Sequence, residues 1–227
     1  MKLLAIDTST EACSAALGID DQVFSYYELA PRKHAELILP MVEELLSEAQ
    51  LSFAQLDVLA FGRGPGSFTG LRIAAGVIQG IAFGADLPVV PVSSLAALAQ
   101  GASRTHAVDK VLAGFDARMC EVYWSMYQID STGLARLNGK ELVCKPDSIP
   151  LPDDTGWTGA GSAWHEYHGI LECRLGGKLR GWHRNCYPQA LDIVSLGMDG
   201  FRQGMSVSAE DAIPVYLRDN VVTLKMN

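Results

Sequence analysis

The sequence predicts an α/β fold built on mixed sheets, and three observations carry that prediction. Short apolar runs bounded by turn residues are separated by longer stretches with helical periodicity. Three such apolar runs follow one another before the first helical stretch, which indicates an antiparallel meander. Strand and helix patterns then alternate, which is typical of parallel strands joined by crossover helices.

The first part of the chain shows this rhythm most clearly. Strands are predicted at 2–7, 12–19, 23–29, 57–62 and 88–92, and helices at 33–50, 67–84 and from 93 to at least 102. The turn Asp20-Asp21-Gln22 joins the second and third strands. The helix at 33–50 contains Pro40, and because an interior proline costs about 3 kcal/mol, this helix should either kink there or begin later.

The second part of the chain begins in the same way. A hairpin is predicted from strands at 111–116 and 121–129 around Ala117-Arg118-Met119, with a third strand at 134–143. A short strand at 156–159 and a short helix at 162–171 follow, and a helix at 188–203 places Leu191, Val194, Met198 and Phe201 on one face.

The order of three strands, helix, strand, helix, strand, helix is that of the ribonuclease-H-like half-domain found in sugar kinases, actin and the Hsp70 chaperones. The second part reads as an eroded copy of it. We therefore expect two lobes, 1–103 and 104–227, separated by the polar stretch 101–109.

Composition and charge limit the classes of function. The chain is 48% hydrophobic and 19% charged, as in ordinary globular proteins, and its apolar runs predict neither a secretory signal nor a membrane span, so we expect a cytoplasmic protein. Five cysteines without CxxC spacing indicate reduced, mostly buried thiols. The net charge of −8 argues against strong tRNA binding by this chain alone, since Arg174, Lys178, Arg180, His183 and Arg184 form only a weak basic cluster.

The most specific segment is Gly62-Arg63-Gly64-Pro65-Gly66-Ser67-Phe68-Thr69-Gly70-Leu71-Arg72. Its glycines permit close backbone approach between a strand and a helix, and the free N–H groups at the helix start could receive an anion. The segment is not a Walker loop, because no Gly-Lys-Ser or Gly-Lys-Thr follows. A glycine-rich turn of this kind is more often a tight connection than a phosphate site.

The helix at 67–84 carries many small residues, among them Gly70, Ala74, Gly76, Gly80 and Gly84. Each interior glycine costs up to about 1 kcal/mol relative to alanine, and close approach by another helix would offset that. The helix at 33–50 is apolar over a wide arc. We interpret these two helices as covered by the sheet on one side and by a partner protein on the other. The alternative is that both helices pack only within this chain.

Catalytic groups are sparse. Asp7 ends the first strand, where an acid holds metal-bound water in the kinase and actin superfamily, but satisfying a strand-end turn is the favoured explanation. His165 and His168 form the only close histidine pair and are expected at the surface, and Ser93-Ser94 lacks a nucleophile-elbow pattern. Asp116 and Arg118 are expected to form an internal ion pair.

Several motifs together resemble the TsaB (YeaZ) family of bacterial proteins over nearly the whole chain. They are Leu4-Ala5-Ile6-Asp7-Thr8-Ser9-Thr10, the glycine-rich stretch 64–72, Pro91-Val92-Ser93-Ser94-Leu95, Asp116-Ala117-Arg118-Met119, Gly159-Ala160-Gly161-Ser162, and Glu210-Asp211-Ala212-Ile213-Pro214-Val215-Tyr216-Leu217-Arg218. Single pieces are weak signals, but their order and spacing make the match specific.

The resemblance implies a two-lobed ASKHA fold and a heterodimer with the catalytic homologue TsaD, to which the ATPase TsaE attaches. Together these proteins transfer a threonylcarbamoyl group to the adenosine beside the anticodon of tRNA. The family pairs through the two helices of the first lobe. The expected interface residues are His34, Leu37, Ile38, Met41, Leu45, Leu71, Ala74, Ala75 and Ile78, and Gly64, Pro65, Gly66 and Gly70 are expected to form the structural turn.

One departure from the catalytic homologue supports a non-catalytic subunit. Where that homologue carries an HxxxH metal pair, this chain has Ser94 and Leu98, and neither replaces an imidazole ligand. The resemblance therefore implies no catalytic residue, metal or cofactor of the chain's own; ADP or ATP at the joint with TsaD and TsaE, and self-association of the free chain, stay open. A small nucleotide-dependent phosphotransferase and an M22-like peptidase are the alternatives.

Overall fold

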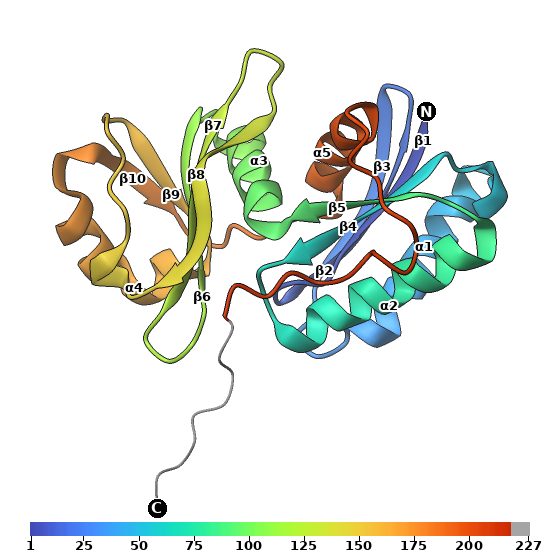
Figure 1. Ribbon diagram of the computed structural model, residues 1–227, viewed down its shortest axis with the longest axis horizontal. Helices are drawn as coiled ribbons and strands as arrows, with labels where there is room; N and C mark the ends of the chain where they lie inside the picture. The colour runs from blue at the N-terminus through green and yellow to red at the C-terminus, as the bar shows by residue number, and fades with distance from the viewer. Residues whose placement is uncertain (219–227) are drawn as a thin grey trace, which may run out of the picture.

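Two five-stranded sheets stand side by side in the computed structural model, which describes residues 1–218 (Figure 1). The first sheet contains β1 (Lys2–Asp7), β2 (Ala12–Ile19), β3 (Gln22–Leu29), β4 (Val58–Gly64) and β5 (Val89–Ser93). The second contains β6 (Lys110–Asp116), β7 (Val122–Ile129), β8 (Ala135–Cys144), β9 (Trp157–Ala160) and β10 (Leu179–His183).

Five α-helices cover these sheets. They are α1 (His34–Glu48), α2 (Phe68–Ala85), α3 (Ser94–His106), α4 (Ser162–Leu175) and α5 (Ala190–Arg202). Short 3-10 helices occupy Phe53–Gln55, Pro146–Ser148 and Gly176–Lys178.

Both sheets have the same topology. The first runs β3-β2-β1-β4-β5 and the second, read from the other end, runs β8-β7-β6-β9-β10. In each, the first three strands pair antiparallel and the last two pair parallel. This repetition confirms the predicted two-lobed, ribonuclease-H-like fold with a second copy of the half-domain.

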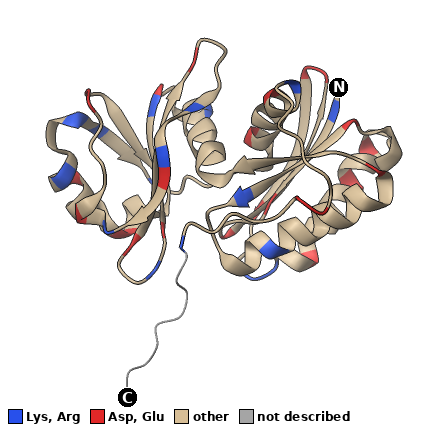
Figure 2. Cartoon of the chain, viewed as in Figure 1, with Lys and Arg blue, Asp and Glu red and all other residues tan. Residues whose placement is uncertain are grey.

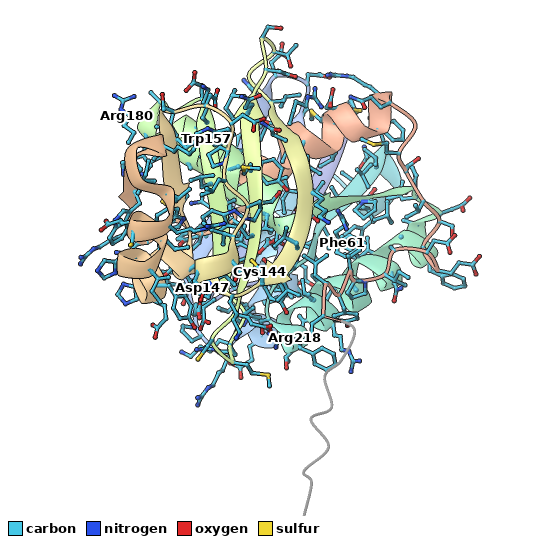
Figure 3. All side chains as sticks on the ribbon, turned by 60° about the vertical axis from the view of Figure 1, so that its left-hand side comes forward. Phe61, Cys144, Asp147, Trp157, Arg180 and Arg218 are labelled. Carbon is cyan, nitrogen blue, oxygen red and sulfur yellow. The ribbon has the colours of Figure 1, made fainter. Side chains whose placement is uncertain are left out.

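The first sheet is buried on both faces, which explains why β1 is an unbroken apolar run. Successive side chains of a strand point to opposite faces. Leu4 and Ile6 accordingly join the core beneath α1 and α2, whereas Leu3 and Ala5 join the core beneath α5. In the second sheet, α3 covers one face and α4 covers the other. Phe61 and Trp157, one from each sheet, are fully buried (Figure 3).

The last helix, α5, returns to the first sheet. α5 follows the second sheet in sequence but packs on the first, where Ile193 and Val194 share one core with the strand residues Leu3 and Ala60. Val207 then bridges Val89, and the Val215 amide donates to the Arg63 carbonyl. The predicted division into 1–103 and 104–227 thus assigns α5 to the second half, whereas its contacts are with the first sheet.

Three details differ from the sequence prediction. Strand β10 was not expected, because its residues are only partly buried and its sequence mixes Arg180, Gly181 and His183 with apolar residues. The helix α1 begins at His34 and continues through Pro40 to Glu48; Pro40 lies on the exposed side. The cysteines are free, but only Cys13 is buried, while Cys120 and Cys173 are exposed.

The helix α2 is unusually apolar for its position. Among the described residues, α2 is the one helix long and apolar enough to cross a membrane, with a mean hydropathy of 1.3. Core helices of globular proteins can be equally long and apolar. Only 33% of its residues are buried, so much of its apolar surface is uncovered.

Candidate functional site

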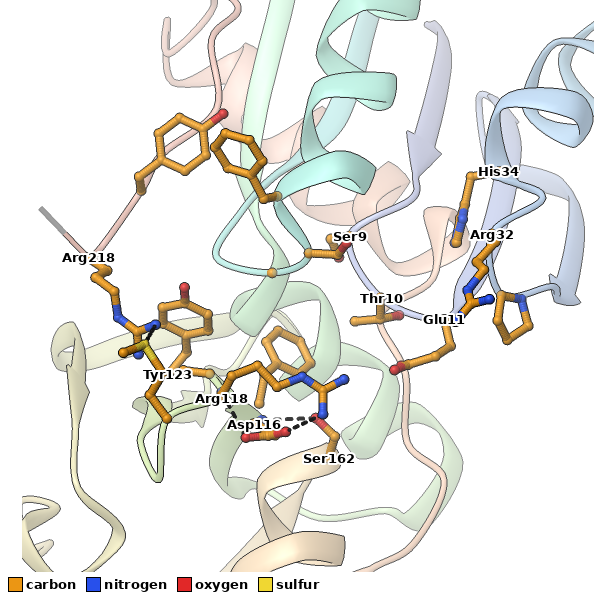
Figure 4. A pocket seen from close by; sticks show the side chains of 18 residues that line it. Ser9, Thr10, Glu11, Arg32, His34, Asp116, Arg118, Tyr123, Ser162 and Arg218 are labelled. Atoms are coloured by element: carbon orange, nitrogen blue, oxygen red, sulfur yellow. Dashed lines mark hydrogen bonds and ion pairs between the residues drawn. The ribbon is translucent and has the colours of Figure 1, made fainter. Parts of the chain in front are cut away.

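A cavity of about 740 Å³ lies between the two halves (Figure 4). Its walls come from the β1–β2 turn, the starts of α1, α2 and α4, the β6–β7 hairpin and the segment that ends at Arg218. The lining residues are Ser9, Thr10, Glu11, Pro31, Arg32, His34, Gly66, Ser67, Phe68, Phe115, Asp116, Ala117, Arg118, Met119, Tyr123, Ser162, Tyr216 and Arg218.

The glycine-rich turn between β4 and α2 packs tightly against the turn that follows β1. The Ser67 amide donates to the Ser9 carbonyl at 2.7 Å, and the Thr8 hydroxyl donates to the Gly70 carbonyl at 2.7 Å. A methyl group at Gly70 would lie 1.9 Å from the Thr8 carbonyl oxygen, and one at Gly66 would lie 2.3 Å from that of Ser9. These two positions therefore require glycine because the two turns touch.

The rest of that turn starts α2. Gly64 has a φ of +108°, which favours glycine, and Pro65 follows it through a cis peptide bond. Ser67 then caps the helix, since its side chain accepts from the Gly70 amide. All four residues expected in the structural turn lie here, and their contacts are those of a tight connection at the cavity wall.

Asp7 is buried beside the cavity rather than in it. One carboxylate oxygen, Oδ1, accepts from the Ser9 amide at 2.9 Å and from the Ser9 hydroxyl at 2.8 Å. The other, Oδ2, has no hydrogen-bond partner in residues 1–218 and faces Gly62, where a methyl group would lie 1.9 Å away. Burial raises the pKa of Asp7 to about 7, and the two bonds from Ser9 oppose that rise.

The expected interface residues lie mainly on the inner sides of the two first-half helices. The buried ones are His34, Ile38, Met41, Leu45, Leu71, Ala74, Ala75 and Ile78, while Leu37 is half-buried. The periodicity identified the face that packs on the sheet, because that face is the more apolar one. Other residues of the same helix form the outer surface of α2. Gly76, Gly80 and Gly84 face open space there, and Phe83 is 85% exposed.

His34 lies apart from the other expected interface residues. It is the first residue of α1, is 8% exposed and lines the cavity, and its Nε2 has no hydrogen-bond partner within residues 1–218. The sequence grouped it with the partner surface by helical spacing, which cannot tell the end of a helix at a cavity from its middle.

The β6–β7 hairpin forms the opposite wall. Arg118 pairs with Asp116 at 3.0 Å, which confirms the internal ion pair expected from the sequence. Arg118, Met119 and Cys120 all have positive φ, between 56° and 62°. Three consecutive non-glycine residues in the left-handed region are unusual, and such conformations gather at functional sites.

The residues expected to replace metal ligands have structural roles. Ser94 begins α3, and its hydroxyl accepts from the Gly64 amide at 3.2 Å. Leu98 is fully buried. His165 and His168 are exposed, as expected, and residues 1–218 contain no group of three or more His, Cys, Asp or Glu side chains arranged to hold a metal ion.

Three contacts between side chains of different elements were missed from the sequence. Glu141 of β8 accepts from Arg63 of β4 at 3.3 Å and from the Tyr127 hydroxyl at 2.8 Å, so it joins the two halves. His106 and His183 stack with ring centroids 3.5 Å apart. No local sequence pattern signals these contacts, because the partners lie on different elements. Arg63 and Glu141, for example, are 78 residues apart in the chain.

Among residues 1–218 the basic side chains are spread over both halves of the molecule (Figure 2). In the cluster noted in the sequence, Arg174 binds the Ile149 carbonyl and Lys178 binds that of Asp153, while Arg180 is exposed at the outer side of the second half (Figure 3).

Comparisons with known proteins agree on one group of relatives. A family model described as "TsaD: tRNA N6-adenosine threonylcarbamoyltransferase" matches residues 26–152. The Escherichia coli protein named tRNA threonylcarbamoyladenosine biosynthesis protein TsaB is 42% identical, with 100% of this chain and 98% of that protein covered. Its Haemophilus influenzae namesake is 41% identical, with 100% and 97% covered. The solved structure of YeaZ from Pseudomonas aeruginosa is 47% identical, with a TM-score of 0.88 over 95% of this chain and 99% of that one.

Proposed function

Because the chain belongs to the TsaB family of tRNA threonylcarbamoyladenosine biosynthesis proteins, we propose that it is the non-catalytic subunit of a tRNA threonylcarbamoyltransferase. In this role it pairs with a TsaD-type catalytic subunit, to which a TsaE-type ATPase attaches. The complex transfers the threonylcarbamoyl group to the adenosine next to the anticodon, in the cytoplasm.

The outer face of α2 is the observation that carries the proposed pairing. Gly76, Gly80 and Gly84 lie one turn apart, and a methyl group at any of them would meet nothing within 4 Å. Phe83 is 85% exposed beside them, and Leu39 of the neighbouring α1 is 44% exposed. A smooth apolar helix face of this kind lets another helix approach closely, and the burial gained offsets the helix penalty of the glycines.

A non-catalytic role is supported by the residues at the start of α3. Ser94 is fully buried and engaged with the Gly64 amide, and Leu98 packs in the core between α3 and the second sheet. The Ser94 side chain is therefore engaged in a backbone contact and the Leu98 side chain in core packing. The net charge of −8 further supports a division of labour in which the partner subunits hold most of the tRNA.

The pairing is tested by a charge placed on the outer face. Gly76→Arg adds a long cation where there is open space, so the chain should fold normally. We expect it to weaken association with the TsaD of the same organism at least about tenfold, or roughly 1.4 kcal/mol, because a paired interface must bury that charge. Analytical size exclusion with light scattering measures the complex, and reconstituted modification of tRNA measures its activity.

Gly169→Arg is the matched control. Gly169 is also a helical glycine facing open space, but it lies on α4 of the second half. It should leave both association and modification unchanged. Equal association by both variants would contradict the proposed surface, and modification of tRNA by this chain without TsaD would contradict the non-catalytic role.

Ala74→Arg does not make a second test of the surface. Ala74 is fully buried on the inner face of α2, so an arginine there would disturb folding before any interface was probed. The phosphotransferase and peptidase alternatives are tested separately, by ATP hydrolysis and by peptide cleavage with the purified chain alone.

A further inference from the structure

The strand β3 forms an open edge of the first sheet. It stands at one end of the strand order and pairs only with β2 among residues 1–218. All of its residues except Tyr26 are exposed, and they include four large apolar side chains, Val23, Phe24, Tyr27 and Leu29. An exposed apolar edge is a template for pairing with a further strand, because its outer backbone groups are free.

The register of the β2–β3 hairpin determines which backbone groups point outward. The Ala30 amide donates to the Glu11 carbonyl at 3.1 Å, and the ladder continues from there to the pair of Ile19 and Gln22. Hydrogen-bonded and non-hydrogen-bonded pairs alternate along an antiparallel ladder. The even-numbered residues of β3 therefore bond to β2, and the odd-numbered ones direct their N–H and C=O groups away from it. The outward residues are Val23, Ser25, Tyr27 and Leu29.

The middle of β3 lacks the features that usually prevent edge pairing. Natural edge strands are protected by charged side chains, prolines or bulges. β3 contains no proline, its register with β2 is continuous from Gln22 to Leu29, and its one charged residue, Glu28, lies near the end. The stretch from Val23 to Tyr27 is therefore open to another strand.

This stretch is complementary to a second, antiparallel copy of itself. When Ser25 lies opposite Ser25, Val23 lies opposite Tyr27, and all of these residues have outward backbone groups that can exchange N–H···O=C bonds. On the other face of the sheet, Phe24 of each copy lies opposite Tyr26 of the other. Aromatic pairs and pairs of an aromatic with a β-branched residue are favourable across neighbouring strands.

The charges at the two ends of β3 favour the same arrangement. Asp20 and Asp21 precede the strand, whereas Arg32 and Lys33 follow it, and all four are exposed. Asp21, Arg32 and Lys33 have no ion-pair partner within residues 1–218. Antiparallel pairing brings the acidic end of one copy toward the basic end of the other, so the charges are complementary at both ends.

We propose that β3 pairs with the β3 of a second copy of this chain about Ser25, so that the two first sheets join into one continuous sheet across a two-fold axis. A second copy fits this edge better than an unrelated extended peptide, because backbone direction, apolar side chains and end charges all match under one symmetric register. The contact does not use α2, which packs over β4 and β1, so the inference is independent of the proposed pairing with TsaD.

Sedimentation equilibrium of the full chain over a range of concentrations tests the proposal. We expect a reversible equilibrium between monomer and dimer. Ser25→Pro should weaken dimerisation at least about tenfold, because proline has no N–H to donate and its ring blocks the approach of another strand. Proline is tolerated on an edge strand where the N–H faces solvent, and circular dichroism checks that the variant folds. Gly76→Arg, on the outer face of α2, is the matched control and should dimerise as the unmodified chain does.

Cross-linking provides a measurement that does not depend on proline. Ser25→Cys places two thiols on opposite strands with a Cα separation of about 5.5 Å, which suits a disulfide. Mild oxidation should then give more covalent dimer than in the unmodified chain, whose Cys120 and Cys173 are also exposed. Gln22→Cys is the control, since three residues from the axis the two thiols would be about 20 Å apart and should not cross-link.

A chain that stays monomeric up to millimolar concentration would overturn the proposal, and so would equal cross-linking of Ser25→Cys and Gln22→Cys. Dimerisation that is lost in Gly76→Arg but kept in Ser25→Pro would overturn it as well, because self-association would then use α2. The same holds if the chain remains monomeric and binds an extended peptide along β3. Ser25→Pro should still associate with TsaD, which separates failure of this contact from failure of the proposed pairing.

Discussion

Asp7 shows how a single residue can look catalytic in sequence and be structural in the fold. It ends β1, and the Ser9 amide and hydroxyl bind one of its oxygens, which satisfies the strand-end turn. Its second oxygen is buried without a partner. Burial therefore destabilises the ionised carboxylate in the folded state, and this raises the pKa of Asp7 to about 7.

This residue makes stability depend on pH with a definite sign. Between the usual pKa of 3.8 and about 7, the folded chain binds a proton at Asp7 that the unfolded chain has released. The contribution of Asp7 to the free energy of unfolding should fall as pH rises through that window and stay low above it. Asp7→Asn removes the titration and should raise that free energy at pH 8 by about 1–3 kcal/mol, since burying an ionised group costs more than burying an amide.

Urea unfolding of both proteins at pH 8 and pH 4.5 measures the effect. The advantage of Asp7→Asn should be largest at pH 8 and shrink toward pH 4.5, where Asp7 is protonated in the folded state. A variant less stable than the unmodified chain at pH 8 would show that the charged form of Asp7 is stabilised by the fold.

At the scale of an element, α2 has two faces with opposite requirements. Its inner face packs Ala74, Ala75 and Ile78 on the first sheet. Its first turn touches the β1–β2 turn so closely that Gly70 has no room for a methyl group, whereas Gly80 faces open space. The same residue type therefore serves close backbone contact at one end and a smooth outer surface along the rest.

This contrast predicts opposite effects of one substitution. Gly70→Ala should lower the free energy of unfolding by about 2–4 kcal/mol, because the methyl group would overlap the Thr8 carbonyl. Gly80→Ala should raise it by about 0.5–1 kcal/mol, since alanine is the better helix former. Thermal and urea unfolding of the two variants measure both changes, and loss of stability in Gly80→Ala would mean that this face is packed within the chain.

At the scale of the whole molecule, a polar network joins the two halves. Arg63 comes from the first sheet and Glu141 and Tyr127 from the second, and the Tyr127 hydroxyl also lies 3.3 Å from that of Ser93. Burial, with the nearby Glu141, raises the pKa of Tyr127 well above its usual value, so its hydroxyl stays protonated and donates to Glu141. The walls of the cavity depend on this joint, because they come from both halves.

Removing one member of the network should reveal its contribution. Glu141→Ala leaves Arg63 without its carboxylate and should lower the free energy of unfolding by about 1–3 kcal/mol, less than for a fully buried pair because Arg63 is a quarter exposed. Tyr127→Phe removes only a hydroxyl and should cost about 1 kcal/mol. Urea unfolding compares them, and an effect of Glu141→Ala no larger than that of Tyr127→Phe would count against the ion pair.

Local pattern was enough to predict most of the elements. The meander β1–β3, the helices α1 to α3 and the glycine turn before α2 follow from periodicity, turn residues and caps that lie within a few residues of each other. For example, the first residues of the two predicted helices, Ser67 and Ser93, are the N-caps of α2 and α3. Strand β10 was not predicted, because it is short, contains basic residues and is only half-buried.

The sequence by itself therefore determined the fold class, the repeated half-domain and the family. Only the tertiary structure decided that α5 returns to the first sheet, that Glu141 meets Arg63, and that His34 lines the cavity instead of the outer helix surface. The physical reason is that periodicity reports which side of an element is apolar. It does not report which distant element covers that side, because that depends on how both halves pack together.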